Sequence, residues 1–172
     1  MNSIRPTLTP PEALIRSYAT AGAYTDCYVM EVARAVALVD YVEAFYTSRV
    51  FKLERAVLRL VAFKPSTDAG ARQLALGTAR SFAAWSVEER TASQLLLRDF
   101  LGRTRSWLMV EPMSGCPART RLYFGTAVTP QKSGRDGGQD IGAVFRALTG
   151  FHRAYTLTLM RSARHRLLAA AP

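Results

Sequence analysis

The chain contains few residues of the types that commonly do chemistry, and they form no established catalytic signature. His152 stands beside Phe151 and Tyr155 in an apolar helical pattern, where it could act as a general base or a polar anchor. Glu88, in a strand pattern close to Trp85, is a second possible acid or base. No carboxylate stands at a local spacing that would orient His152, so a hydrogen-bonded structural histidine is the simpler interpretation.

Metal and thiol chemistry find no support in the sequence. Cys27 and Cys116 are far apart, and with His152 and His165 they form no CxxC or HxxxH pair. Cys116 has no local histidine that would activate its thiol. We therefore expect no metal site, no cofactor and no cysteine nucleophile.

Aromatic residues are the more promising candidates for ligand contact. Trp85 and Trp107 alternate with apolar neighbours in strand patterns, and each indole N–H requires a partner when it is buried. Tyr123 and Tyr155 combine an apolar ring with a hydroxyl that could orient a ligand. For all four residues, core packing and a cavity wall remain open alternatives.

Charged residues are interspersed with these aromatics. Strict alternation along a strand places Glu88 and Arg90 on one face, and likewise Arg105 with Trp107. Arg119 and Arg121 share a face with Tyr123 in the same way. An inward arginine could bind an acidic headgroup through two hydrogen bonds. An outward arginine would only keep the sheet soluble.

The composition predicts one folded domain with a strong positive charge. The 172 residues are 49% hydrophobic and carry 23 basic against 13 acidic side chains, a net charge of +10. This charge indicates either an anionic partner or a GC-rich bacterial source that favours arginine, since only Lys52, Lys64 and Lys132 are lysines. The arginines are dispersed, and the one dense run, 161–166, lies near a helix C-terminus, so we expect no specific nucleic-acid site.

The N-terminus lacks the apolar stretch of a signal peptide, and no apolar run is long enough to span a membrane, so a cytoplasmic location is expected. Residues 1–22 contain three prolines and predict an extended lead-in with a helical turn near 12–18. Residues 23–170 then form the single domain, with a homodimer as a possible assembly.

The periodicity predicts an antiparallel α+β arrangement. Residues 35–61 are helical with a break at Thr47 and Ser48, where Ser48 caps a second helix. Residues 93–111 are expected to form a β-hairpin. A three-residue loop at 101–103 would place Asp99 opposite Arg105 and Leu97 opposite Trp107. Asp26 is interpreted as a turn or cap residue. The remaining expected elements are strands at 24–33, 82–90, 93–100, 104–111 and 119–128, a short helix ending near 78, a turn at 112–118, a polar loop at 130–140 and a helix at 141–169.

This element order resembles the helix-grip fold of the START-like, polyketide-cyclase-like (SRPBCC) superfamily. The resemblance covers about residues 20 to 168, although that superfamily usually has six or seven strands and five are evident here. It rests on YTDCYVMEV at 24–32, FAAWSVEER at 82–90, TRSWLMVEP at 104–112, TRLYFGTAV at 120–128 and FHR at 151–153.

The resemblance implies a curled sheet around the long C-terminal helix, with a cavity between them. It implies a small apolar or amphipathic ligand there, with candidate contacts Trp85, Trp107, Tyr123, His152, Tyr155, Arg105 and Glu88. Fold alone does not decide between a binding module, a cyclase- or hydrolase-like enzyme that uses His152 or Glu88, and an interaction protein with a filled core.

Overall fold

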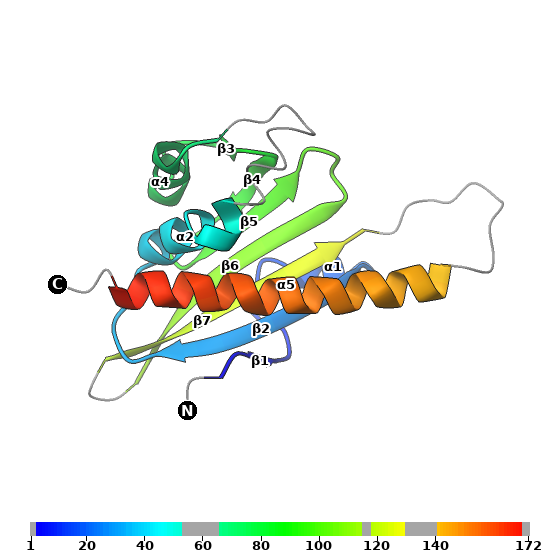
Figure 1. Ribbon diagram of the computed structural model, residues 1–172, viewed down its shortest axis with the longest axis horizontal. Coiled ribbons are helices and arrows are strands. Elements are labelled where there is room, and N and C mark those ends of the chain that lie inside the picture. Colours follow the sequence, from blue (N-terminus) through cyan, green and yellow to red (C-terminus); the bar gives the residue numbers. More distant parts are fainter. Residues whose placement is uncertain (1–2, 53–65, 115–117, 130–140, 170–172) are drawn as a thin grey trace.

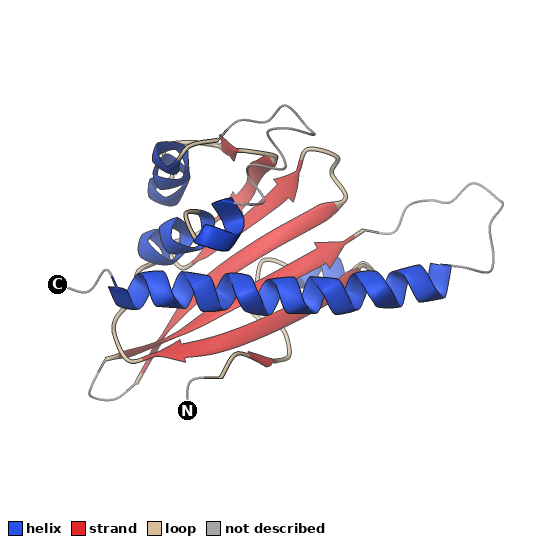
Figure 2. Ribbon diagram, in the orientation of Figure 1, coloured by secondary structure: helices blue, strands red, loops and turns tan. Residues whose placement is uncertain are grey.

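A computed structural model of the chain describes residues 3–52, 66–114, 118–129 and 141–169, and the side chains of the last helix from Arg153 onward. It shows an α+β architecture in which helices lie across one face of an antiparallel sheet (Figures 1 and 2). The predicted fold class is confirmed at this level.

The sheet has seven strands in the order β1-β2-β7-β6-β5-β4-β3, and it is open because β1 and β3 form its edges. Its long strands are held by uninterrupted pairing of β2 with β7 and of β7 with β6. The strand bounds are β1 Arg5–Pro6, β2 Tyr24–Val32, β3 Ser81–Phe82, β4 Trp85–Arg90, β5 Gln94–Asp99, β6 Thr104–Met113 and β7 Arg119–Val128.

The first face of the sheet, here called the helical face, is covered by three helices (Figure 1). These are α2 (Leu38–Tyr46), α4 (Asp68–Leu76) and α5 (Ile141–Ala169). The predicted long C-terminal helix is confirmed, and α5 buries Leu159, Met160, Ala163 and Leu167 in the main core. The periodicity of this helix predicts an apolar stripe of Val144, Leu148, Phe151, Tyr155 and Leu159, and the first three of these side chains lie outside the described part of the structure.

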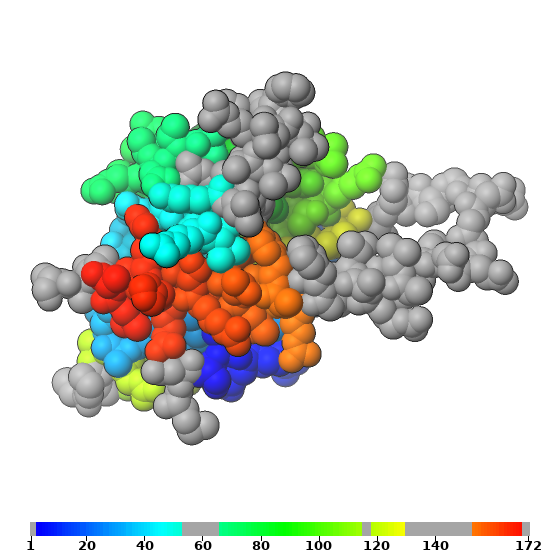
Figure 3. Space-filling model, viewed as in Figure 1, coloured from blue at the N-terminus to red at the C-terminus, as the bar shows by residue number. Residues whose placement is uncertain are grey.

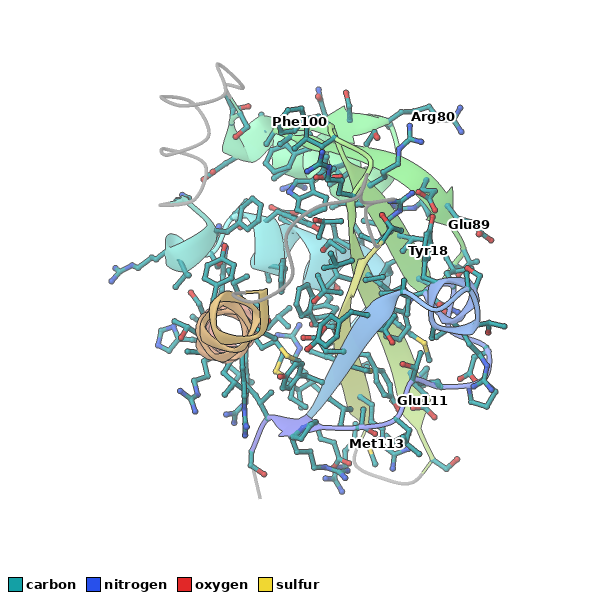
Figure 4. All side chains as sticks on the ribbon, turned by 90° about the vertical axis from the view of Figure 1, so that its right-hand side faces the viewer. Tyr18, Arg80, Glu89, Phe100, Glu111 and Met113 are labelled. Carbon is teal, nitrogen blue, oxygen red and sulfur yellow. The ribbon has the colours of Figure 1, made fainter. Side chains whose placement is uncertain are left out.

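The opposite face, here called the N-terminal face, is covered by the first residues of the chain. After β1 pairs with β2, the chain crosses this face and forms α1 (Arg16–Thr20). Figure 4, which views α5 end-on, shows the sheet between α5 and α1. Ala13 and Ile15 are buried here against Trp107. The segment that was predicted as an extended lead-in therefore packs against the sheet.

Local sequence signals set the helix ends, and the predicted cap at Ser48 is confirmed. The Oγ of Ser48 accepts a hydrogen bond from the backbone N–H of Phe51 at 3.3 Å, and a helix follows from residue 49. Thr67 caps α4 by accepting from Gly70 N–H at 3.1 Å. Gly77 ends α4 with a positive φ of 78°. The second half of the predicted 35–61 region lies outside the described residues.

The predicted register of the 93–111 hairpin is wrong by one residue. Arg98, not Asp99, lies opposite Arg105, and Trp107 lies opposite Leu96 instead of Leu97. The reason is the turn: the Oδ1 of Asp99 accepts from the backbone N–H groups of residues 103 and 104, at 2.7 and 3.0 Å. Asp99 therefore closes a four-residue loop, and the slip moves Trp107 to the face opposite Leu97.

The strand predicted at 82–90 is two strands. Ala83 adopts a positive φ of 53° and turns the chain between β3 and β4. A bulge between Val87 and Glu89 then breaks the alternation of side chains. Glu88 and Arg90 consequently point to opposite faces, which corrects the prediction that they share one.

Two further expectations need correction. Asp26 is an inner residue of β2 that pairs with Thr126, and it is not a turn residue. The turn predicted at 112–118 begins later, because Pro112 and Met113 still pair with β7. Among the described residues, no helix is both long and apolar enough to cross a membrane.

Candidate ligand-binding site

A row of polar side chains crosses the helical face near one end of the strands. The register aligns Asp26 of β2 with Thr126 of β7, and Thr126 with Ser106 of β6. The Oη of Tyr46, from α2, lies 3.2 Å from the Oγ of Ser106. We call these four residues the polar row.

The polar row is well ordered by its own hydrogen bonds. The Oδ1 of Asp26 accepts from the backbone N–H of Thr126 at 2.9 Å and from its hydroxyl at 2.6 Å. Thr126, Ser106 and Tyr46 are buried. A carboxylate and three hydroxyls on a mainly apolar face are costly unless they are hydrogen-bonded, so this row is a specific feature of the interior.

The strand ends beside the polar row carry aromatic and apolar side chains. Ser106 aligns with Leu97 and Leu97 with Val87, which continues the row across the sheet. One step towards the strand ends, Trp85 lies opposite Asp99. Trp85 and Val87 are only partly buried, whereas Leu97 is fully buried. This end of the helical face is therefore less completely covered than its centre.

Three buried polar atoms on the helical side have no hydrogen-bond partner within the described structure. They are the Oη of Tyr41 on α2, the Nε1 of Trp85 on β4 and the Oγ1 of Thr156 on α5. Burial also raises the pKa of Tyr41 well above its usual range, with smaller contributions from Tyr46 and Cys27. Each unpaired group costs about 1–3 kcal/mol, which a water or a ligand that pairs with it would recover.

The helical face next to the polar row is filled by aromatic packing that includes the ring of Tyr46. Phe45 stacks on Phe124 with ring centroids 4.9 Å apart, and Tyr46 meets Phe51 edge-on at 4.7 Å. Phe82 joins the same cluster through Tyr46 and Phe51. The packing fixes the ring of Tyr46, so its hydroxyl stays directed at Ser106.

The N-terminal face is organised around Gln94. Its Oε1 accepts from the indole N–H of Trp107 and from the backbone N–H of Leu14, both at 2.9 Å. Its Nε2 donates to the carbonyl of Glu12 at 3.0 Å. One side chain thereby holds the N-terminal segment to the sheet and satisfies Trp107.

Several charged residues of the N-terminal face are paired with one another. Arg105 donates to Glu88 at 3.0 Å and lies over the ring of Tyr18, whose hydroxyl also donates to Glu88. Tyr18 and Glu111, both labelled in Figure 4, lie on the side of the sheet away from α5. Further along, Glu31 bonds to both Arg119 and Arg121, and Tyr123 donates to Glu111 at 2.5 Å.

Two groups on the N-terminal face have strongly shifted pKa values. Burial, with help from the hydrogen bond to Glu111, raises the pKa of Tyr123 to about 12. Burial, with a smaller contribution from Asp26, raises the pKa of the Cys27 thiol to about 12 as well. Both side chains are therefore neutral at physiological pH, and Cys27 is a poor nucleophile.

The structure separates the predicted ligand contacts into two groups. Trp85 and Tyr155 are on the helical side and pack against the main core. Trp107, Tyr123, Arg105 and Glu88 are on the N-terminal face, so they do not line a space between the sheet and α5. The side chain of His152 lies outside the described residues.

Sequence reasoning missed the polar row. Asp26, Ser106 and Thr126 are polar residues on a strand face that continues with apolar side chains, and that interruption was the available signal. Alternation of side chains along the strands places all three on the same face as Tyr28, Leu108 and Phe124, which a correct register would have shown. Tyr46 could be assigned to the row only once the helix packing was known.

The groups available to a metal or cofactor are few. Among the described residues, no three Cys, His, Asp or Glu side chains cluster in a way that could hold a metal ion.

No protein-family model, curated protein or solved structure significantly matches the chain.

Proposed function

We propose that this chain is a small-molecule-binding domain that holds an amphipathic ligand on the helical face of its sheet, beneath α5. The apolar part of the ligand lies against Trp85 and Val87. Its polar group is directed at the polar row, where Ser106 and Asp26 offer hydroxyl and carboxylate oxygens. In this proposal the sheet and α5 form a helix grip around the ligand.

The observation that carries the proposal is the set of unpaired polar atoms on the helical side. Tyr41, Trp85 and Thr156 come from two helices and one strand, and each presents a buried polar atom without a partner in the described structure. Buried polar groups usually pair with protein atoms, ordered water or a bound molecule, and a ligand is the partner that this proposal assigns to them. The partly covered strand ends next to the polar row provide the adjoining apolar surface.

Binding, not catalysis, is the function that the geometry supports best. Glu88, one of the two candidate acid–base residues, is on the other face and is engaged by Arg105 and Tyr18. The described polar row contains a single carboxylate, Asp26, which accepts two hydrogen bonds from Thr126. No described pair of groups on the helical face is arranged as a nucleophile with its base.

The experiment is native mass spectrometry of freshly purified protein, followed by titration with fatty acids, sterols and aromatic polyketides. We expect a co-purified small molecule or saturable binding of one class. Ser106→Ala should then weaken binding about fivefold, because one hydrogen bond contributes about 1 kcal/mol.

Tyr123→Phe is the matched control, since it also removes one hydroxyl but from the N-terminal face, and it should change affinity less than about twofold. A protein that carries no molecule and binds none of the panel would refute the proposal. That result would favour an interaction protein with a filled core.

A further inference from the structure

A concave region lies along the C-terminal turns of α5. It is a groove of about 630 Å³ between residues 48–50 and the last three turns of α5. These two segments, cyan and red, lie next to each other on the face shown in Figure 3. Its lining residues are Ser48, Arg49, Val50, Thr158, Arg161, Ser162, His165, Arg166 and Ala169.

The lining of this groove is basic and rich in donors. Arg49 enters from one wall, and Arg161 and Arg166 enter from α5. The hydroxyls of Ser162 and Thr158 add neutral donors, and none of the described lining residues is acidic. Guanidinium groups and hydroxyls together are the usual recognition set for oxyanions.

Within the described part of the chain, the three arginines have no ion-pair partner. Arg49, Arg161 and Arg166 make no ion pair with any other described residue, whereas Arg105, Arg119 and Arg121 on the sheet are each paired with a glutamate. The helix dipole accounts for Arg166 in the last turn of α5, but it does not account for Arg49 on the opposite wall. Like charges that line one groove repel one another, and an anion would relieve that repulsion.

A neighbouring groove shows what a self-neutralised site looks like in the same region. It has a volume of about 200 Å³ and shares Arg166, but Asp40 and Glu43 line it together with Arg34. Its acids and bases are balanced, so it needs no external anion. The basic groove differs in having no such balance among the lining residues that the structure describes.

We propose that the basic groove binds the phosphate group of a phosphomonoester. Three guanidinium groups from two walls suit a dianion with several acceptor oxygens better than a carboxylate, which one arginine can satisfy. A volume of about 630 Å³ is enough for a phosphate with a small organic body attached. The body can be a soluble metabolite or a lipid, and both present the same headgroup chemistry.

The test measures binding of three probes at about 150 mM salt: inorganic phosphate, adenosine 5′-monophosphate, and phosphatidylcholine vesicles that contain phosphatidic acid. The site variant is Arg161→Gln with Arg166→Gln. The control is Arg98→Gln with Arg103→Gln, which removes the same charge from the exposed β5–β6 hairpin. Circular dichroism confirms that both variants fold.

We expect at least one probe to bind saturably, and the site variant to weaken it at least about tenfold while the control changes it less than about threefold. Binding of the soluble probes identifies a metabolite site, and binding of the vesicles alone identifies a lipid headgroup site. Equal losses in the two variants would overturn the proposal, because they would assign the binding to net charge. Failure of all three probes, or tighter binding of duplex DNA that the site variant abolishes, would also overturn it.

Discussion

On the N-terminal face, Trp107 and Tyr123 are buried with their polar atoms bonded to Gln94 and Glu111. On the helical side, Tyr41 and Thr156 are buried with polar atoms that have no described partner. The two sides of one sheet therefore differ in how completely their buried polar atoms are hydrogen-bonded. A satisfied face is a structural interface, whereas an unsatisfied one retains capacity to bind another molecule.

The contrast also explains why the N-terminal segment belongs to the fold. The side chain of Gln94 makes three hydrogen bonds, two to the backbone of the N-terminal segment and one to Trp107. Arg105 and Tyr18 of α1 both bond to Glu88. These contacts close the N-terminal face to ligands. The helical face has no comparable set of paired charges among its described side chains.

The largest expected effect comes from Gly125, where the N-terminal face is tightest. A Cβ there would lie 2.8 Å from the carbonyl oxygen of Asp26 and 3.0 Å from the ring of Trp107. We expect Gly125→Ala to lower the free energy of unfolding by about 3 kcal/mol or more, measured by urea denaturation.

Gly70→Ala is the matched control, because its Cβ would meet Phe82 only at 3.4 Å within α4. This substitution should be neutral or stabilising by about 0.5 kcal/mol. Equal losses in the free energy of unfolding for the two substitutions would show that the packing of Trp107 against β7 is not as close as described.

The next largest effect is expected at Gln94. Gln94→Ala leaves the indole N–H of Trp107 without a partner and detaches the backbone at residues 12 and 14, so we expect a loss of about 3 kcal/mol. Hydrogen exchange should show faster exchange of the amide of Leu14. Unchanged protection of that amide would contradict the role assigned to Gln94.

High pH should weaken the N-terminal face. The pKa values of Cys27 and Tyr123 are both about 12 in the folded protein, above their ordinary values of 9.0 and 10.0. The folded state therefore holds these protons more tightly, so its stability is complete below about pH 9 and falls as the pH rises towards 12. Each group contributes a slope of up to about 1.4 kcal/mol per pH unit.

Urea denaturation at pH 8 and at pH 10.5 measures this effect. Cys27→Ala removes one of the two groups, so it should reduce the loss of stability between the two pH values. A loss that is the same with and without the thiol would show that Cys27 is not shifted.

The smallest effect compares one tyrosine on each face. Tyr123→Phe removes a hydrogen bond to Glu111 and should cost about 1 kcal/mol. Tyr41→Phe removes an unpaired hydroxyl and should be neutral or stabilising by up to about 1 kcal/mol in ligand-free protein. A clear loss for Tyr41→Phe would mean that its hydroxyl is satisfied without a ligand.

Much of the fold could be predicted from local patterns. The bounds of β7 and α5, the break at Ser48 and the cap at Thr67 all follow from periodicity and capping residues. The short strands β1 and β3 could not, because two residues carry no periodic signal. Their pairing depends on tertiary contacts that the sequence does not display.

The candidate site was harder to predict because it depends on the face to which each strand residue points. One extra residue in the loop after Asp99 and one bulge after Val87 reassigned Trp107 and Glu88 to the N-terminal face. Both changes arise from backbone hydrogen bonding in turns and bulges, which side-chain alternation does not encode. Trp85 lies on the helical side, as Val87 does, because no bulge or turn separates the two residues.

The two tryptophans allow the central claim to be tested directly, since one lies on each face. Trp107→Phe retains only Trp85, and Trp85→Phe retains only Trp107. Each protein is titrated with the fatty acid, sterol and polyketide panel while its tryptophan emission is recorded. We predict that a ligand shifts the emission of Trp85 and leaves that of Trp107 unchanged. A response from Trp107 with none from Trp85 would place the ligand on the N-terminal face and contradict the proposal.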